Sequence, residues 1–285
     1  MKRIRTIAVL PTLLTIGNLI CGFFAIVVAS RINSHAPSEY DTTNVMIAGY
    51  LIFAAMIFDA LDGQVARLAR ITSDFGAQLD SLCDMVTFGV APGFLLVKMC
   101  PDFHLVQTDP QVLNPFFPGL QTVWVIAALF AACAAMRLAR FNVESGEDDD
   151  HLHFNGLPSP AAAATLASFA VMFYTLRRGN AWFLPYLKEY GVNLDWWLQM
   201  ILPFFAAAVA LLMVSRIRYP HLVNQLVRGN RSFSHVVRVL FALMAVMITL
   251  PYSLPIVCGL FAIVSPIRYS WEVLVQRRTQ EEPMF

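Results

Sequence analysis

The sequence is poor in charged residues, which make up 14% of its 285 positions. A soluble domain carries about a quarter charged residues, so this deficit argues against a soluble globular protein. In contrast, 58% of the residues are hydrophobic, and they fall in long blocks that are typical of membrane proteins. The net charge of +1 is uninformative by itself. We expect the lipid bilayer, and no nucleic acid, as the environment of this chain.

Cysteine pairs and internal repeats are also lacking. The five cysteines are scattered and form no CxxC motif, so we interpret them as small core residues and not as disulfide or zinc ligands. The N-terminus has the basic start of a secretory signal peptide. Its apolar block is longer than a typical 7–15-residue signal core, and Pro11 and Asn18 interrupt it. We therefore retain this block as the first membrane helix.

The apolar blocks predict an all-α polytopic membrane protein with about eight transmembrane helices. Each block is near the ~20 residues that a helix needs to cross ~30 Å of hydrocarbon. The predicted spans are 9–31, 45–66, 77–99, 121–141, 159–176, 198–215, 235–250 and 252–268. The six helices within 1–220 are predicted to form one membrane domain, and 221–285 a two-helix extension. The prolines of "LPYSLP" predict a tight turn between the last two helices.

Lysine and arginine are distributed unevenly between the two sides of this predicted bundle. With the N-terminus inside, 15 basic residues fall on the inner side and 5 on the outer side. The positive-inside rule therefore places both termini in the cytoplasm. The acidic run from Glu144 to His153 is then a solvated cytoplasmic loop, and its lack of fixed spacing argues against a metal site there.

Four aspartates interrupt the second and third apolar blocks. Asp59 and Asp62 are three residues apart, and Asp80 and Asp84 are four apart, so each pair lies on one helix face. The linker at roughly 67–76 is short, which makes the two helices antiparallel neighbours. We therefore expect one pocket with four carboxylates at the cytoplasmic ends of these helices.

Carboxylates in a membrane need compensating positive charge. A charged aspartate deep in a bilayer costs about 2.5–3.5 kcal/mol on insertion scales, so four cost on the order of 10 kcal/mol. Hard divalent cations suit carboxylate oxygens, whereas zinc prefers His and Cys. Gly63, Ala66 and Gly76 allow a ligand to approach the backbone, and Arg67 lies one turn beyond Gly63. This combination is typical of a site for a magnesium-bound diphosphate.

Two other interpretations explain the acids alone. One is a helix end that faces the cytoplasm, and the other is the ion pathway of a transporter. Neither explains the glycines and the arginine. Transporters also usually show paired repeats and helices broken near the bilayer midplane, whereas no repeat is evident in this sequence.

The pattern Asp59-x2-Asp62-Gly63-x2-Ala66-Arg67-x8-Gly76-x3-Asp80-x3-Asp84 resembles, without a departure, the signature of the CDP-alcohol phosphotransferases. Further segments resemble one branch of that family, the membrane-embedded phosphatidylserine synthases. These segments are "LPTLLTIGNLICGF", "RLARFN", "FNGLPSPAAA" and "LMVSRIRYP", so the resemblance covers roughly residues 9–220.

This resemblance implies an enzyme of phospholipid biosynthesis in which the hydroxyl of L-serine attacks CDP-diacylglycerol and releases CMP. It implies one or two Mg²⁺ or Mn²⁺ ions on Asp59, Asp62, Asp80 and Asp84, with Asp84 also taking the proton of the hydroxyl. The residues implied to bind CDP-diacylglycerol are Gly63, Ala66, Arg67, Ser73, Gly76, Thr15 and Asn18. It also implies a homodimer, in a bacterial inner membrane, with the site facing the cytoplasm.

The identity of the acceptor alcohol is inferred from fewer residues. Arg137 or Arg140 is placed to pair with the carboxylate of serine, and Asn142, Asn155 or Ser159 to hydrogen-bond it. The alternative for both arginines is that they only anchor the inner end of the fourth helix. Other acceptors, such as choline, glycerol phosphate or inositol phosphate, remain open alternatives, although "FNGLPSPAAA" favours serine.

Overall fold

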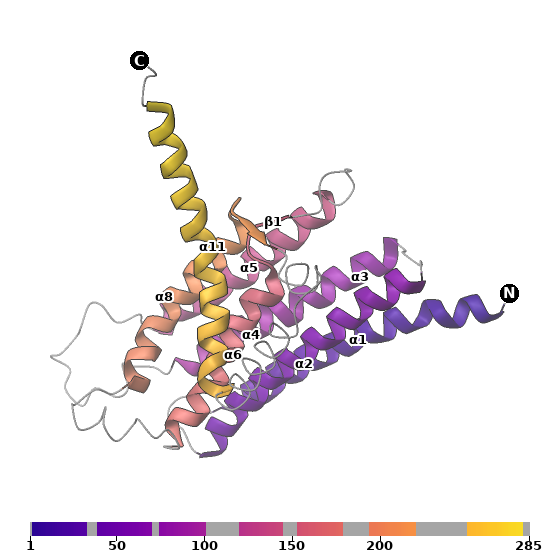
Figure 1. Cartoon of the computed structure of the whole chain (residues 1–285). Coiled ribbons are helices and arrows are strands. Elements are labelled where there is room, and N and C mark those ends of the chain that lie inside the picture. Colours follow the sequence, from indigo (N-terminus) through magenta and orange to yellow (C-terminus); the bar gives the residue numbers. More distant parts are fainter. Residues whose placement is uncertain are drawn as a thin grey trace, which may run out of the picture.

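The computed structural model describes residues 2–32, 39–69, 74–100, 120–144, 153–178, 194–220 and 250–281. Figure 1 shows a bundle of helices with one small two-stranded sheet. Its elements are α1 (Lys2–Ser30), α2 (Glu39–Ala69), α3 (Asp74–Asp84), the π-helix η1 (Met85–Val90), α4 (Ala91–Met99), α5 (Leu120–Glu144), β1 (His153–Asn155), α6 (Ser159–Arg177), α8 (Leu194–Val214), β2 (Arg218–Pro220) and α11 (Leu250–Glu281).

Seven segments of the described residues are helical, long and apolar enough to cross a membrane. They coincide with seven of the eight predicted spans, which confirms the prediction of an all-α polytopic membrane protein. The predicted span at 235–250 lies outside the described residues, apart from its last residue. Large apolar side chains such as Phe23, Ile57 and Leu211 are more than half exposed on the bundle surface, as expected for helices that face lipid. The predicted division at residue 220 stays a prediction.

One predicted turn is wrong. The segment "LPYSLP", Leu250 to Pro255, forms the start of α11 and not a turn between two helices. Pro251 lies in the first turn, where the backbone N–H has no partner within the helix, so proline is tolerated there. Pro251 therefore suits the beginning of this long helix, whereas Pro255 lies inside it.

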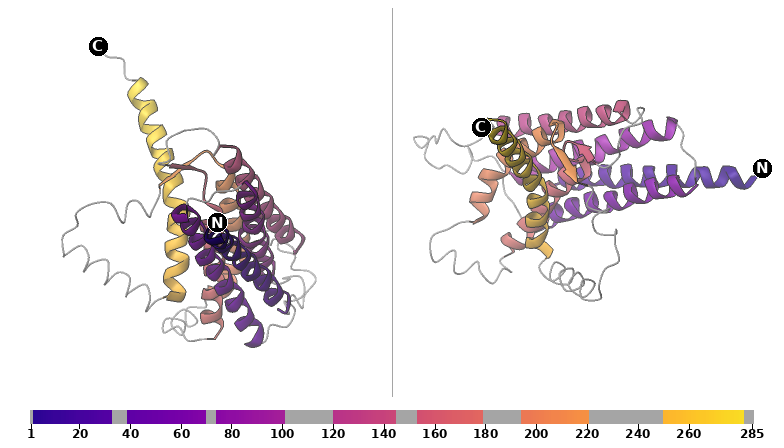
Figure 2. Two further views of the ribbon diagram at one scale, coloured as in Figure 1. Left: turned by 90° about the vertical axis from the view of Figure 1, so that its right-hand side faces the viewer. Right: turned by 45° about the horizontal axis from the view of Figure 1, so that its top comes forward.

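The centre of the bundle consists of α6 and the continuous helix formed by α3, η1 and α4. In the most apolar 18-residue stretch of each of these two spans, 67% is buried inside the protein, compared with 22% for the span in α11. Both views in Figure 2 show α1 and α2 running side by side. On α2, Gly49 lies against the Ala167 carbonyl of α6, where any larger side chain would collide. Such close approach of small residues is a usual way of packing membrane helices.

The π-helix η1 begins directly after Asp84, the last residue of α3. Residues in a π-helix are wound more widely than in an α-helix, and such turns occur frequently at functional sites. Thr87 of η1 donates a hydrogen bond to the Asn18 carbonyl at 3.3 Å and fills the position that a Cβ at Gly22 would occupy. The absence of a side chain at Gly22 therefore allows α1 to lie directly against η1.

The two strands join the segment before α6 to the segment after α8. They pair antiparallel, with Phe154 opposite Tyr219. The Gly156 N–H then donates to the Ile217 carbonyl at 2.8 Å, and its φ of +86° is a conformation that favours glycine. This pairing fixes the segment that leads directly into the N-terminus of α6.

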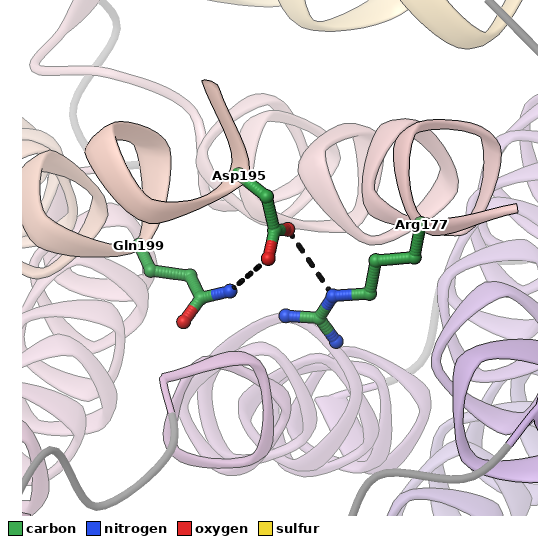
Figure 3. Close-up of polar contacts among 3 residues, drawn as sticks. All are labelled: Arg177, Asp195 and Gln199. Atoms are coloured by element: carbon green, nitrogen blue, oxygen red, sulfur yellow. Dashed lines mark hydrogen bonds and ion pairs between the residues drawn. The ribbon is translucent and has the colours of Figure 1, made fainter. Parts of the chain in front are cut away.

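The opposite end of α6 carries a separate polar contact. Figure 3 shows Arg177 and Gln199 directed at the carboxylate of Asp195. Arg177 Nε donates to Asp195 Oδ1 at 3.1 Å, and Gln199 Nε2 donates to Asp195 Oδ2 at 2.6 Å. α6 has 19 residues and thus a length of about 28 Å at ~1.5 Å per residue. The contact therefore lies about one membrane thickness from Ser159.

We expect Arg177→Gln to have little effect on stability or catalysis. The side chain of Arg177 is 20% exposed and that of its partner Asp195 39%, and ion pairs that reach the surface contribute about 0–1 kcal/mol. The melting temperature in detergent and the rate of product formation measure both effects. A large loss of activity in a folded variant would show that this end of α6 takes part in the reaction.

Candidate active site

Three aspartates from two helices come together at one place. Asp59 and Asp62 extend from the last part of α2, and Asp80 extends from α3. One carboxylate oxygen from each of the three lies within 4.8 Å of the others. Asp62 is buried, and the other two are half-buried. The predicted convergence of the second and third apolar blocks is therefore present in the fold.

The donor set of this cluster fits a hard divalent cation. It offers only carboxylate oxygens, which are the ligands that Mg²⁺ and Mn²⁺ prefer. Asp80 Oδ1 is buried and has no hydrogen-bond partner among the described residues. A buried charged oxygen in that state is costly unless a cation or a donor reaches it. The three side chains together thus have the composition and spacing of a metal site.

Asp84 stands slightly apart from these three. It is not part of the group whose oxygens share the 4.8 Å spacing, although it interacts electrostatically with Asp59, Asp80 and Asp62. Its side chain is buried, and its Oδ1 accepts a hydrogen bond from Asn18 Nδ2 at 2.9 Å. The fourth carboxylate is therefore adjacent to the cluster but is held by a different partner.

Helix α1 supplies the hydrogen-bond donors for the two buried aspartates. Thr15 Oγ1 donates to Asp62 Oδ2 at 2.9 Å, and Asn18 makes the bond to Asp84. Thr15 and Asn18 were expected to line the phosphate side of CDP-diacylglycerol. The structure brings both residues to the site, and in it their side-chain donors are directed at the aspartates.

Arg137 of α5 supplies positive charge next to the carboxylates. Its guanidinium interacts electrostatically with Asp84 and Asp59. Arg137 Nη1 donates to Ser159 Oγ at 2.7 Å, and Ser159 is fully buried at the start of α6. The guanidinium also lies 5.9 Å from the centre of the Phe141 ring. Because a guanidinium has five N–H donors, the bond to Ser159 leaves others that an anionic ligand could accept.

The other residues predicted for the acceptor alcohol are less closely grouped. Arg140 lies on α5, one turn beyond Arg137. The Asn142 side chain donates from Nδ2 to Ser81 Oγ at 2.9 Å and thereby connects α5 to α3 between Asp80 and Asp84. Asn155 lies in β1, and its side chain is outside the described residues.

The residues predicted for the liponucleotide are described only in part. A Cβ built on Gly63 would meet no atom within 4 Å, so space is open beside the aspartates of α2. Gly76 is the third residue of α3. Ala66 and Arg67 belong to α2, but their side chains lie outside the described residues, as does the whole of Ser73.

This arrangement brings together three carboxylates that could hold a cation, a fourth carboxylate and a guanidinium. A cation neutralises phosphate oxygens, an arginine pairs with a phosphate or carboxylate, and a nearby free carboxylate accepts a proton. The combination suits transfer of a phosphorus-containing group to a hydroxyl. Sequence reasoning missed the contributions of Ser81 and Thr87, because small hydroxyl residues within apolar blocks carry no local signal of their distant partners.

Comparison with known proteins places the chain among relatives of one kind. The sequence model of the family described as CDP-alcohol phosphatidyltransferase matches residues 8–212. A CDP-diacylglycerol–serine O-phosphatidyltransferase of Methanocaldococcus jannaschii is 30% identical over 269 residues, which cover 94% of this chain and 98% of that protein. The enzyme of the same name from Bacillus subtilis is 30% identical, covering 74% of this chain and 90% of that protein. An archaetidylserine synthase of Methanothermobacter thermautotrophicus is 30% identical, with coverages of 77% and 72%.

Proposed function

Because the chain belongs to the CDP-alcohol phosphatidyltransferase family, we propose that it transfers a phosphatidyl group from CDP-diacylglycerol to the hydroxyl of L-serine. The products are phosphatidylserine and CMP. Serine as the acceptor is supported by the names of relatives that match over most of their length. The observation that carries the chemistry is the cluster of Asp59, Asp62 and Asp80 with Asp84 beside it.

In the proposed reaction the serine oxygen forms a bond to the lipid-side phosphorus. The bond from that phosphorus to the oxygen that bridges the two phosphates breaks, and CMP leaves with the electron pair. Asp84 takes the proton of the hydroxyl, because it is the carboxylate of the four that lies outside the cluster. Its Oδ1 is occupied by Asn18, so Oδ2 is the oxygen that accepts the proton.

We propose that Asp59, Asp62 and Asp80 hold one or two Mg²⁺ or Mn²⁺ ions, with Asp84 at the edge of the metal centre. A bound cation would neutralise the negative charge that grows on the diphosphate as CMP departs. The protein itself contributes the three carboxylates and the α1 hydroxyl that fixes Asp62.

We expect turnover to require an added divalent cation. Three carboxylates whose oxygens lie within 4.8 Å of one another repel each other unless a cation is present. CMP release should stop in excess chelator and return when Mg²⁺ or Mn²⁺ is added back. Full turnover in excess chelator would contradict the metal site.

The liponucleotide is proposed to lie over the end of α2 and the start of α3. The open space at Gly63 supports a close approach of the diphosphate to the backbone. Arg67, one turn beyond Gly63, is proposed to contact the phosphates, with Ala66, Ser73 and Gly76 around the cytidine. These assignments follow from the resemblance of the motif.

Arg137 is proposed to bind the carboxylate of serine. The buried Ser159 hydroxyl fixes one guanidinium nitrogen, which leaves an edge for a bidentate contact.

We expect Arg137→Gln to raise the KM for serine by about tenfold or more, since charge-assisted hydrogen bonds contribute about 1.5–3 kcal/mol. Initial rates at varied serine measure this, with Arg177→Gln as the matched control. An unchanged KM for serine would favour the alternative that Arg137 only anchors the helix.

The orientation and assembly of the enzyme are proposed from the sequence and the family. The excess of basic residues on one side supports both termini and the site facing the cytoplasm of a bacterial inner membrane. A homodimer is proposed from the family resemblance. At the boundary between the membrane and the cytoplasm, the acyl chains of the substrate remain in lipid while its head group meets free serine.

A panel of acceptors tests the proposed function. Purified protein receives CDP-diacylglycerol, Mg²⁺ or Mn²⁺, and one of serine, glycerol 3-phosphate, inositol phosphate or choline, and both CMP and the lipid product are measured. We expect CMP and phosphatidylserine only with serine. Equal or faster reaction with another acceptor would reject serine, and the absence of CMP with every acceptor would favour an ion pathway.

A further inference from the structure

We propose that Asn18 is a positioning residue that orients the Asp84 carboxylate for accepting the proton of the acceptor hydroxyl. The inference rests on the proposed function, in which Asp84 is the base. It gives Asn18 a different task from the liponucleotide contact expected from the sequence. The bond that carries it is the one from Asn18 Nδ2 to Asp84 Oδ1, at 2.9 Å between two buried side chains.

The backbones on both sides of this bond are fixed relative to each other. The Asn18 carbonyl accepts a hydrogen bond from Thr87, three residues after Asp84 in the chain. One turn beyond Asn18, Gly22 brings α1 into contact with the same threonine. The amide of Asn18 is therefore presented to Asp84 from a rigid contact between α1 and the π-helix.

The hydrogen bond from Asn18 holds the Asp84 carboxylate in one orientation, whereas without this bond the carboxylate could rotate. The terminal torsion of an aspartate is broad, so packing alone fixes its carboxylate poorly. The neighbouring carboxylates of Asp59 and Asp80 repel Asp84 and favour its turning away from the cluster. The donor on Asn18 opposes that rotation and leaves Oδ2 as the free oxygen.

A second observation concerns the acceptor atom of the Asn18 amide. Asn18 Oδ1 is buried and has no hydrogen-bond partner among the described residues. Unpaired buried acceptors are rare in folded proteins, and each calls for a specific explanation. A hydroxyl, an ammonium group or a water that arrives with the substrates has the donor that this oxygen lacks.

The test compares Asn18→Leu with Thr15→Val. The two residues lie one turn apart on α1, and each donates one 2.9 Å hydrogen bond to an aspartate, Asn18 to Asp84 and Thr15 to Asp62. We expect Asn18→Leu to lower kcat by about 10- to 100-fold, as a misplaced reacting group does. The KM for CDP-diacylglycerol and the rise in melting temperature on adding Mn²⁺ should stay unchanged. Thr15→Val should instead raise the Mn²⁺ concentration needed for half-maximal activity.

A double variant separates positioning from a general structural effect. If Asn18 acts through Asp84, adding Asn18→Leu to Asp84→Asn should lower kcat by less than about twofold further. If Asn18→Leu does not fold, Asn18→Ala, which removes the donor without adding a charge, takes its place with the same expected loss.

Two results would overturn the inference, namely an unchanged kcat in the single variant, or losses that multiply in the double variant. Neither result would affect the proposed function, which the acceptor panel with the unmodified protein tests separately.

Discussion

Asp84→Asn is expected to abolish most of the catalytic activity while the protein stays folded and binds CDP-diacylglycerol. The amide has the same shape as the carboxylate, and its oxygen still accepts the hydrogen bond from Asn18. The three aspartates of the cluster are unchanged and retain the metal site. Only the capacity to accept a proton is lost, and a positioned acid–base group contributes about 10²–10⁴-fold to the rate.

The measurement is kcat for CMP release together with equilibrium binding of CDP-diacylglycerol in detergent. Asp195→Asn is the matched control, because it makes the same substitution far from the site. Asp195 lies at the start of α8 and is bonded to Arg177, at the end of α6 opposite to Ser159. The control should keep normal kinetics. A variant at Asp84 that lost binding in proportion to turnover would show that Asp84 serves substrate binding rather than proton transfer.

Asp59→Asn is expected to lower both substrate binding and turnover. Asp59 is one of three carboxylates whose oxygens lie within 4.8 Å of one another, so the substitution removes one of three negative charges from the cluster. Divalent cations bind less tightly when the number of charged ligands falls. Because the diphosphate binds through the metal in the proposed function, the affinity for CDP-diacylglycerol should fall with the affinity for metal.

The difference from Asp84→Asn is in the metal dependence. The Asp59 variant should need a higher Mg²⁺ or Mn²⁺ concentration for half-maximal activity, and excess metal should restore part of its turnover. Loss of turnover with unchanged metal dependence and unchanged liponucleotide binding would remove Asp59 from the metal site.

The convergence of the aspartates was predictable because it depends on local spacing. Residues three and four apart share a helix face in any α-helix, and a short linker makes successive helices neighbours. The separation of Asp84 from the other three was not predictable in this way. Asp84 is bonded to Asn18, which lies 66 residues away in the sequence, and it is followed by a π-helix that no apolar pattern distinguishes from an α-helix.

Asn142 and the segment "LPYSLP" show two further limits of sequence reasoning. The contact of Asn142 with the acceptor alcohol stays a prediction, and the bond from its amide to Ser81, 61 residues away, was not foreseen. A polar residue near a site has the same signature whether it contacts substrate or connects helices. The prolines of "LPYSLP" were assigned to a turn, although proline is equally suited to the first turn of a helix such as α11.

The most direct test of the division of roles among the four aspartates is a metal titration of the unmodified protein, Asp59→Asn and Asp84→Asn, with CDP-diacylglycerol and serine saturating. We predict that rising Mn²⁺ restores part of the activity of the Asp59 variant and leaves the Asp84 variant about 10²–10⁴-fold below the unmodified rate. Restoration of Asp84→Asn to near the unmodified rate by excess metal would contradict it, because Asp84 would then act chiefly as a ligand.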